Sequence, residues 1–179
     1  MAQYNDTGLK PDDVKKHMVD WLRDAHAMEV QAETMLKKQL DRIEHYPELT
    51  ARIEQHITET QNQARLVEEC LKRYDASYSG IKDMGAKVTA FGQAMGGMFV
   101  GDEVVKGVQA SYVFENLEIA SYKILIAAAE VIGDSETRST CESILKEEIA
   151  MAEWLSDYMP KVTQQFLTRE SIPDAEAKR

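Results

Sequence analysis

Apolar residues recur alternately every three and four positions along four long segments of this chain, and glycine and proline rarely interrupt them. This spacing puts the apolar side chains on one face of an α-helix, which turns once in about 3.6 residues. None of the four segments has the two-residue period of a strand. Nine glycines and four prolines in 179 residues are also few for the frequent turns of a sheet protein. The sequence predicts an all-α protein.

Proline, glycine and acidic residues mark the ends of the predicted helices. The four long helices are expected at about residues 11–44, 48–75, 102–132 and 135–160. A turn at 75–80 and a shorter helix through about residue 95 separate the second from the third. Residues 170–179 form a polar tail that is expected to fray. We expect one domain over residues 1–179, with the bundle at about 11–160.

Connection lengths indicate how the helices are arranged. The first and second helices, and the third and fourth, are joined by short connections, so each pair is expected to form an antiparallel hairpin. Residues 75–101 are numerous enough to cross the bundle. The result is an up-down-down-up four-helix bundle with a short helix in its long crossover, the connection pattern of ferritin-like folds.

The charge of the chain excludes several partners. A net charge of −10 repels nucleic-acid phosphates and anionic lipids, so we expect neither nucleic-acid nor membrane binding. No apolar run reaches the roughly 18 residues of a membrane span, and residues 1–10 lack the apolar centre of a signal peptide. Cys70 and Cys141 are far apart in sequence, as expected for two reduced thiols. A cytoplasmic protein is predicted.

Each predicted helix places a glutamate in the middle of its inward stripe. These residues are Glu29, Glu59, Glu118 and Glu148, with Glu115 one turn before Glu118. The stripe of the second helix is less regular, and Thr60 fits it as well as Glu59 does. His56, three residues before Glu59, is as readily a buried structural histidine as a ligand. Glu29 and Glu59 are 30 positions apart, and so are Glu118 and Glu148, which indicates an old duplication.

The free-energy cost of burying charge indicates what these glutamates do. A buried carboxylate without a partner costs several kcal/mol, and neighbouring carboxylates also repel one another. The stripes contain no Lys or Arg to compensate them. Two divalent metal ions would bring a charge of +4 against −5 from the five glutamates. Oxygen-rich ligands suit iron or manganese, so the sequence predicts a two-metal site, iron first. The competing interpretation leaves each glutamate on a solvated face.

Four strings carry a family resemblance: DAHAME at 24–29, HITET at 56–60, FENLEIASY at 114–122 and EEIAMA at 147–152. They resemble the bacterial YciE/YciF stress-protein family, most closely its YciE branch, over nearly the whole chain. The resemblance implies a ferritin-like fold related to rubrerythrins, a homodimer, and a role in general and osmotic stress whose reaction is uncertain. The wider superfamily carries histidine three positions after a glutamate, where this chain has Asn62 and Met151.

Two functions follow as hypotheses. In the first, the metal ligands are Glu29, His56, Glu59, Glu115, Glu118 and Glu148, and the di-iron site reacts with peroxide or dioxygen or handles iron. A manganese catalase-like variant belongs to the same hypothesis. In the second, the chain is a non-catalytic stress module or metal sensor with an incomplete site, which the missing histidines favour. A mineral-storing cage is a third possibility. The sequence leaves the electron donor open.

Overall fold

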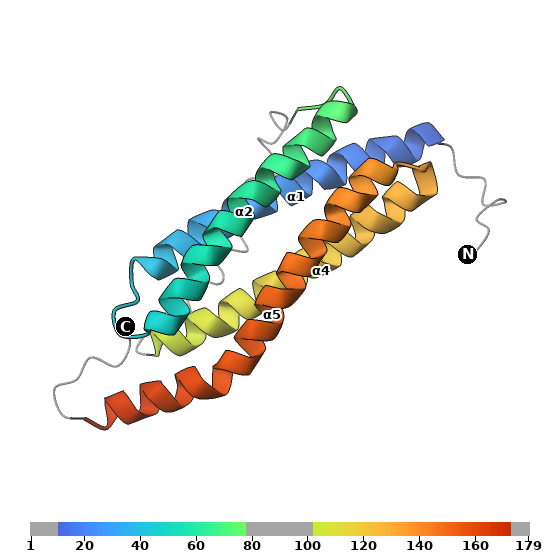
Figure 1. Ribbon diagram of the computed structural model, residues 1–179. Coiled ribbons are helices and arrows are strands. Elements are labelled where there is room, and N and C mark those ends of the chain that lie inside the picture. Colours follow the sequence, from blue (N-terminus) through green and yellow to red (C-terminus); the bar gives the residue numbers. More distant parts are fainter. Residues whose placement is uncertain (1–10, 78–101, 173–179) are drawn as a thin grey trace.

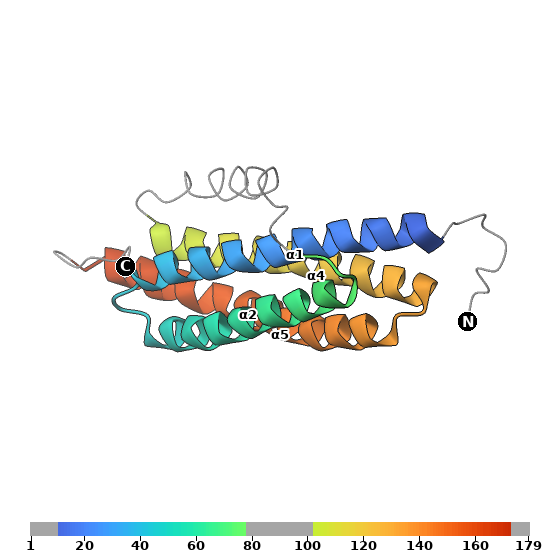
Figure 2. The same ribbon diagram turned by 90° about the horizontal axis from the view of Figure 1, so that it is seen from above.

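The computed structural model describes residues 11–77 and 102–172. Within these ranges it contains four helices and no strand: α1 (Pro11–Leu40), α2 (Pro47–Arg73), α4 (Glu103–Ile132) and α5 (Ser135–Glu170). Figures 1 and 2 show two antiparallel hairpins, α1–α2 and α4–α5, with α2 and α4 running in the same direction. The predicted up-down-down-up bundle is confirmed. The predicted crossover helix and the last seven residues of the tail lie outside the described residues.

Local signals explain most helix ends. Pro47 occupies the first turn of α2, where its missing N–H is not needed. Gly133 ends α4 in the left-handed conformation, with a φ of 74°, and the Asp134 side chain caps α5 by accepting from the Thr137 amide. α1 ends at Leu40 rather than near Glu44, because the backbone hydrogen bonds of Arg42 and Ile43 span three residues instead of the four of an α-helix.

The prediction that the fourth helix ends near Pro160 is wrong. α5 continues through Pro160 to Glu170, and Figure 1 shows it bending near this point. An interior proline costs roughly 3 kcal/mol. Beyond it, Val162 and Phe166 continue the buried stripe and pack with Tyr46 and Leu49 at the start of α2. Burying two such side chains contributes about 1.5–3 kcal/mol each, enough to offset the proline.

The core consists of two apolar clusters. One contains Met18, Leu22, Val67, Leu125 and Ile144, and the other contains Leu36, Ile53, Val108, Met151 and Leu155. Along every helix the inward glutamate or histidine falls between residues of the first cluster and residues of the second. The bundle therefore has a polar layer between two apolar ones. No described helix is long and apolar enough to cross a membrane.

Candidate metal centre

The α4–α5 hairpin supplies three buried carboxylates. Glu115 and Glu118 lie one turn apart on the inner face of α4, with 2% and 1% of their surface exposed. Glu148 lies on the inner face of α5 and is fully buried. All three positions agree with the predicted stripes of these helices.

The α1–α2 hairpin supplies one carboxylate and one imidazole, Glu29 and His56, both fully buried. Of the two residues that fitted the stripe of the second helix, Thr60 is buried and Glu59 is only partly so. The helix therefore turns His56 inward and Glu59 toward the edge of the bundle.

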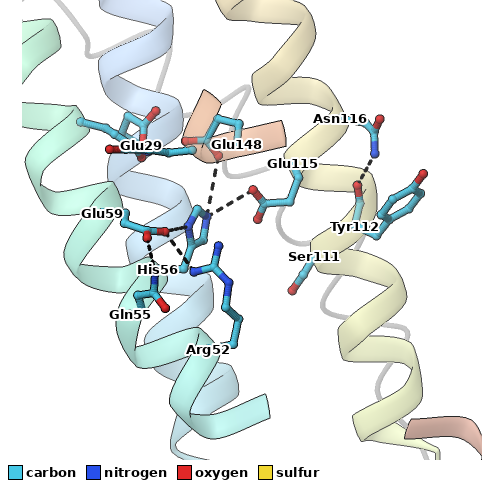
Figure 3. Close-up of polar contacts among 12 residues, drawn as sticks. Glu29, Arg52, Gln55, His56, Glu59, Ser111, Tyr112, Glu115, Asn116 and Glu148 are labelled. Carbon is cyan, nitrogen blue, oxygen red and sulfur yellow. Dashed lines mark hydrogen bonds and ion pairs between the residues drawn. The ribbon is translucent and has the colours of Figure 1, made fainter. Parts of the chain in front are cut away.

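Four of these side chains converge closely. His56, Glu115, Glu118 and Glu148 each bring a ligand atom within 4.8 Å of the others, and this buried group could hold a metal ion. Glu29 lies beside the group, and its Oε1 accepts a hydrogen bond from the Tyr122 hydroxyl. Figure 3 shows His56 at the centre, facing Glu115 and Glu148 on one side and Glu59 on the other.

His56 is held through both ring nitrogens. Its Nδ1 lies 2.9 Å from Glu59 Oε2, while its Nε2 lies 3.2 Å from Glu115 Oε2 and 3.7 Å from Glu148 Oε2. Glu59 also accepts from Arg52 Nη1 at 3.1 Å and from Gln55 Nε2 at 2.7 Å. Glu59 thus lies behind the histidine ring, outside the four converging ligands.

Unpartnered polar atoms test whether a metal fits here. In the described part of the chain, seven buried side-chain atoms of this layer make no hydrogen bond. They are Glu29 Oε2, His56 Nε2, Glu115 Oε2 and both carboxylate oxygens of Glu118 and of Glu148. A buried polar atom costs about 1–3 kcal/mol when it is left without any partner, and here only the ion pairs of His56 Nε2 with Glu115 and Glu148 offset that cost. Six oxygens and one imidazole nitrogen are a donor set that suits iron or manganese, so the residues fit the predicted metal.

The pKa values of several buried groups in this layer are raised when no cation is present. Burial raises the pKa of Glu29 to about 8. Burial and the carboxylate of Glu148 raise the pKa of Glu118 well above its usual range, and Glu148 shifts the same way through burial and Glu115. Burial alone would lower the pKa of His56, but Glu115 and Glu59 outweigh it and raise this pKa to about 10. Protons thus compensate the carboxylates when no metal is bound.

Two contacts of this region were not predicted. The first is the hydrogen bond from the Tyr122 hydroxyl on α4 to Glu29 on α1, both of which are buried. The second joins Gln63 Nε2 on α2 to Glu147 Oε2 on α5 at 2.8 Å. Glu147 lies off the buried stripe of α5 and is half-buried. Side-chain reach across two helices leaves no periodic signal in a sequence.

Comparisons with known proteins agree with this fold and with the predicted family. A family model described as a domain of unknown function, DUF892, matches residues 13–168. A solved protein from Xanthomonas campestris pv. campestris is 44% identical, with 89% of this chain and 99% of that chain covered and a TM-score of 0.76.

Two more distant solved structures share the fold. The Escherichia coli stress protein YciF is 20% identical, with 82% of this chain and 94% of that chain covered and a TM-score of 0.71. A dodecameric thioferritin from Bacteroides fragilis, related to bacterioferritin, is 17% identical, with 92% and 100% covered and a TM-score of 0.67. The chain therefore belongs to the DUF892 family, and its predicted membership among the YciE/YciF-like proteins is confirmed.

Proposed function

We propose that the buried layer binds two metal ions, iron in preference to manganese, and that the loaded protein reacts with peroxide or dioxygen or handles iron during stress. The observation that carries this proposal is the convergence, from four helices, of seven buried polar atoms that make no hydrogen bond. The printed description of YciF as a stress protein supports the physiological setting.

Charge supports two ions rather than one. Glu29, Glu115, Glu118 and Glu148 carry −4 when ionised, and two divalent ions match that charge. Glu59 has its own cation, Arg52, at 3.1 Å. That Glu59 is a metal ligand stays a prediction. In this proposal Glu59 has a different role, which is to hold the imidazole of His56 in place.

The residues have separate tasks in this proposal. His56, Glu115, Glu118 and Glu148 would hold one ion, and Glu29 would extend the site to the second through its free Oε2. Glu59 would keep a proton on His56 Nδ1, so that Nε2, once a metal displaces its own proton, could donate its electron pair to the ion. The Tyr122 hydroxyl fixes the orientation of Glu29. Two bound ferrous ions would supply the two electrons that reduce a peroxide.

One observation favours the second candidate function, a non-catalytic module or metal sensor. The group contains a single histidine, and Met151 is packed into an apolar cluster. Metal analysis of protein purified without chelator separates the two candidates. About two ions per chain, located by anomalous diffraction at the iron and manganese edges, is the expected result, and none would contradict the metal site.

We also propose that the chain is a homodimer, as the family resemblance implies. What supports it is the outer face of α4. A second apolar stripe there has all its members exposed: Val113, Leu117, Ala120, Ile124, Ala127 and Val131. Their spacing alternates between three and four residues, the pattern of a helix–helix seam. The stripe also matches itself when α4 is laid antiparallel on a second α4, which puts Ile124 opposite Ala120.

Light scattering tests the dimer. The wild type is expected at twice the chain mass of 20.3 kDa at micromolar concentration. Ile124→Glu is expected to give the monomer, because it buries a charge in the seam. Ala150→Glu, at an exposed position of α5, is the matched control and should leave the dimer intact. A monomeric wild type would contradict the proposal.

A further inference from the structure

The buried group is enclosed, so a metal ion must pass between helices to reach it. Its five side chains, those of Glu29, His56, Glu115, Glu118 and Glu148, are at most 2% exposed. Two carboxylates that are only half-buried border the group along the edge between α2 and α5: Glu59 on α2, and Glu147 on α5, which is hydrogen-bonded to Gln63 one turn after Glu59. Glu147 is close enough for its charge to raise the pKa of Glu29.

The Glu59 end of this edge is unfavourable to cations. Glu59 already pairs with Arg52 at 3.1 Å and with His56 at 2.9 Å. The Arg52 side chain is only 12% exposed, so its positive charge lies partly inside the bundle on this side. A divalent ion approaching here meets a cation of the protein before it meets a free carboxylate, and the two repel.

The Glu147 end of the edge is different. Among the described residues, no Lys, Arg or His lies within ion-pair distance of Glu147, whose recorded partner is the neutral amide of Gln63 at 2.8 Å. Gln63 is fully buried, and its Oε1 makes no hydrogen bond in the described structure. A carboxylate and an unpartnered amide oxygen therefore lie together between α2 and α5. Oxygen ligands of this kind suit hard divalent cations.

We propose that Glu147 and Gln63 form the entry port through which a divalent cation reaches the buried metal site, an inference that rests on the proposed function. Glu147 is partly exposed to solvent and directly precedes Glu148 in α5. It can therefore bind a hydrated ion at the edge of the bundle and pass it to the buried carboxylate of Glu148. Opening the port breaks one hydrogen bond, Gln63 Nε2 to Glu147 Oε2. Glu147 acts on the rate of loading and Glu148 on the loaded state.

The test measures Mn²⁺ uptake by the apo-protein after rapid mixing, with unbound Mn²⁺ reported by a fast indicator dye. Glu147→Gln is expected to slow uptake about tenfold, since a steering charge changes association rates by roughly that factor or more. It should leave the final number of bound ions unchanged. Glu153→Gln removes an equal charge from an exposed position of the same helix and serves as the matched control. It should load at nearly the wild-type rate.

The outcomes separate this proposal from the metal site itself. If the wild type binds no Mn²⁺ or Fe²⁺ at equilibrium, the metal site fails and the port fails with it. If the wild type loads and Glu147→Gln is no slower than Glu153→Gln, only the port is wrong. If Glu147→Gln instead loses bound ions at equilibrium, Glu147 is a ligand and the port is again overturned. Slow loading to full capacity supports the proposal.

Discussion

The two hairpins have the same glutamate spacing, yet they contribute unequally to the polar layer. Within this layer the α4–α5 hairpin buries three carboxylates, whereas α1–α2 buries one carboxylate and one imidazole. The difference lies in the rotation of α2, which turns His56, Thr60 and Gln63 inward and leaves Glu59, the counterpart of Glu148, at the edge. A repeated spacing therefore preserves the position along the bundle, while the rotation of each helix decides which residue is buried.

The largest effect is expected when the charge of Glu148, on α5, is removed. Glu148→Gln keeps the shape of the side chain but removes its charge, so metal content should fall from about two ions per chain to nearly none. Glu147→Gln should retain the full content at equilibrium. Elemental analysis of both variants measures this directly. Loss of metal from Glu147→Gln alone would show that the inner face of α5 has been placed one residue out of phase.

A second prediction concerns pH and the apo-protein, where the two buried groups of the α1–α2 hairpin act in the same direction. Glu29 has a folded pKa of about 8 against a usual 4.5, so unfolding releases its proton and stability falls as pH rises from about 4.5 to 8. His56 has a folded pKa of about 10 against 6.5, so its contribution is present below 6.5 and is lost as pH rises to about 10.

Urea unfolding of the metal-free protein at pH 6 and pH 8.5 measures this loss. For Glu29, each unit of pH in its window is worth up to about 1.4 kcal/mol of unfolding free energy. Glu29→Gln should therefore flatten the pH dependence relative to the wild type. A metal-free protein that is more stable at pH 8.5 than at pH 6 would contradict the assigned directions.

The smallest effect is expected when the charge of Glu59 is removed, and it tests whether Glu59, unlike Glu148, lies outside the set of metal ligands. If Glu59 only holds His56, Glu59→Gln should weaken metal binding by about 10- to 100-fold without lowering the number of sites, as is usual for a residue behind a ligand. Competition with a chelator gives the affinity, and titration gives the number. A lost site in Glu59→Gln would restore Glu59 as a ligand.

Periodicity predicted the fold and most of the layer, because burial in a bundle follows helical spacing closely. Glu115, Glu118 and Glu148 could be placed from the stripes of their helices alone. On α2 both Thr60 and Glu59 fitted the inward stripe predicted from the sequence. Only packing against the other helices decides which of the two is buried. The continuation of α5 past Pro160 depends on contacts with Tyr46 and Leu49, more than 100 positions away in the sequence. The Gln63–Glu147 bond is equally non-local.

The division of the core by a charged layer bears on how cooperatively the protein unfolds. Apolar contacts couple neighbouring parts of a fold, but between the clusters containing Leu125 and Leu155 lies a layer of polar side chains, several of whose atoms make no hydrogen bond. Without metal, we expect the two halves of the bundle to open partly independently, which hydrogen exchange would detect as two groups of amides with different protection. An ion bound by residues of all four helices would join the halves, so that metal makes unfolding a single transition.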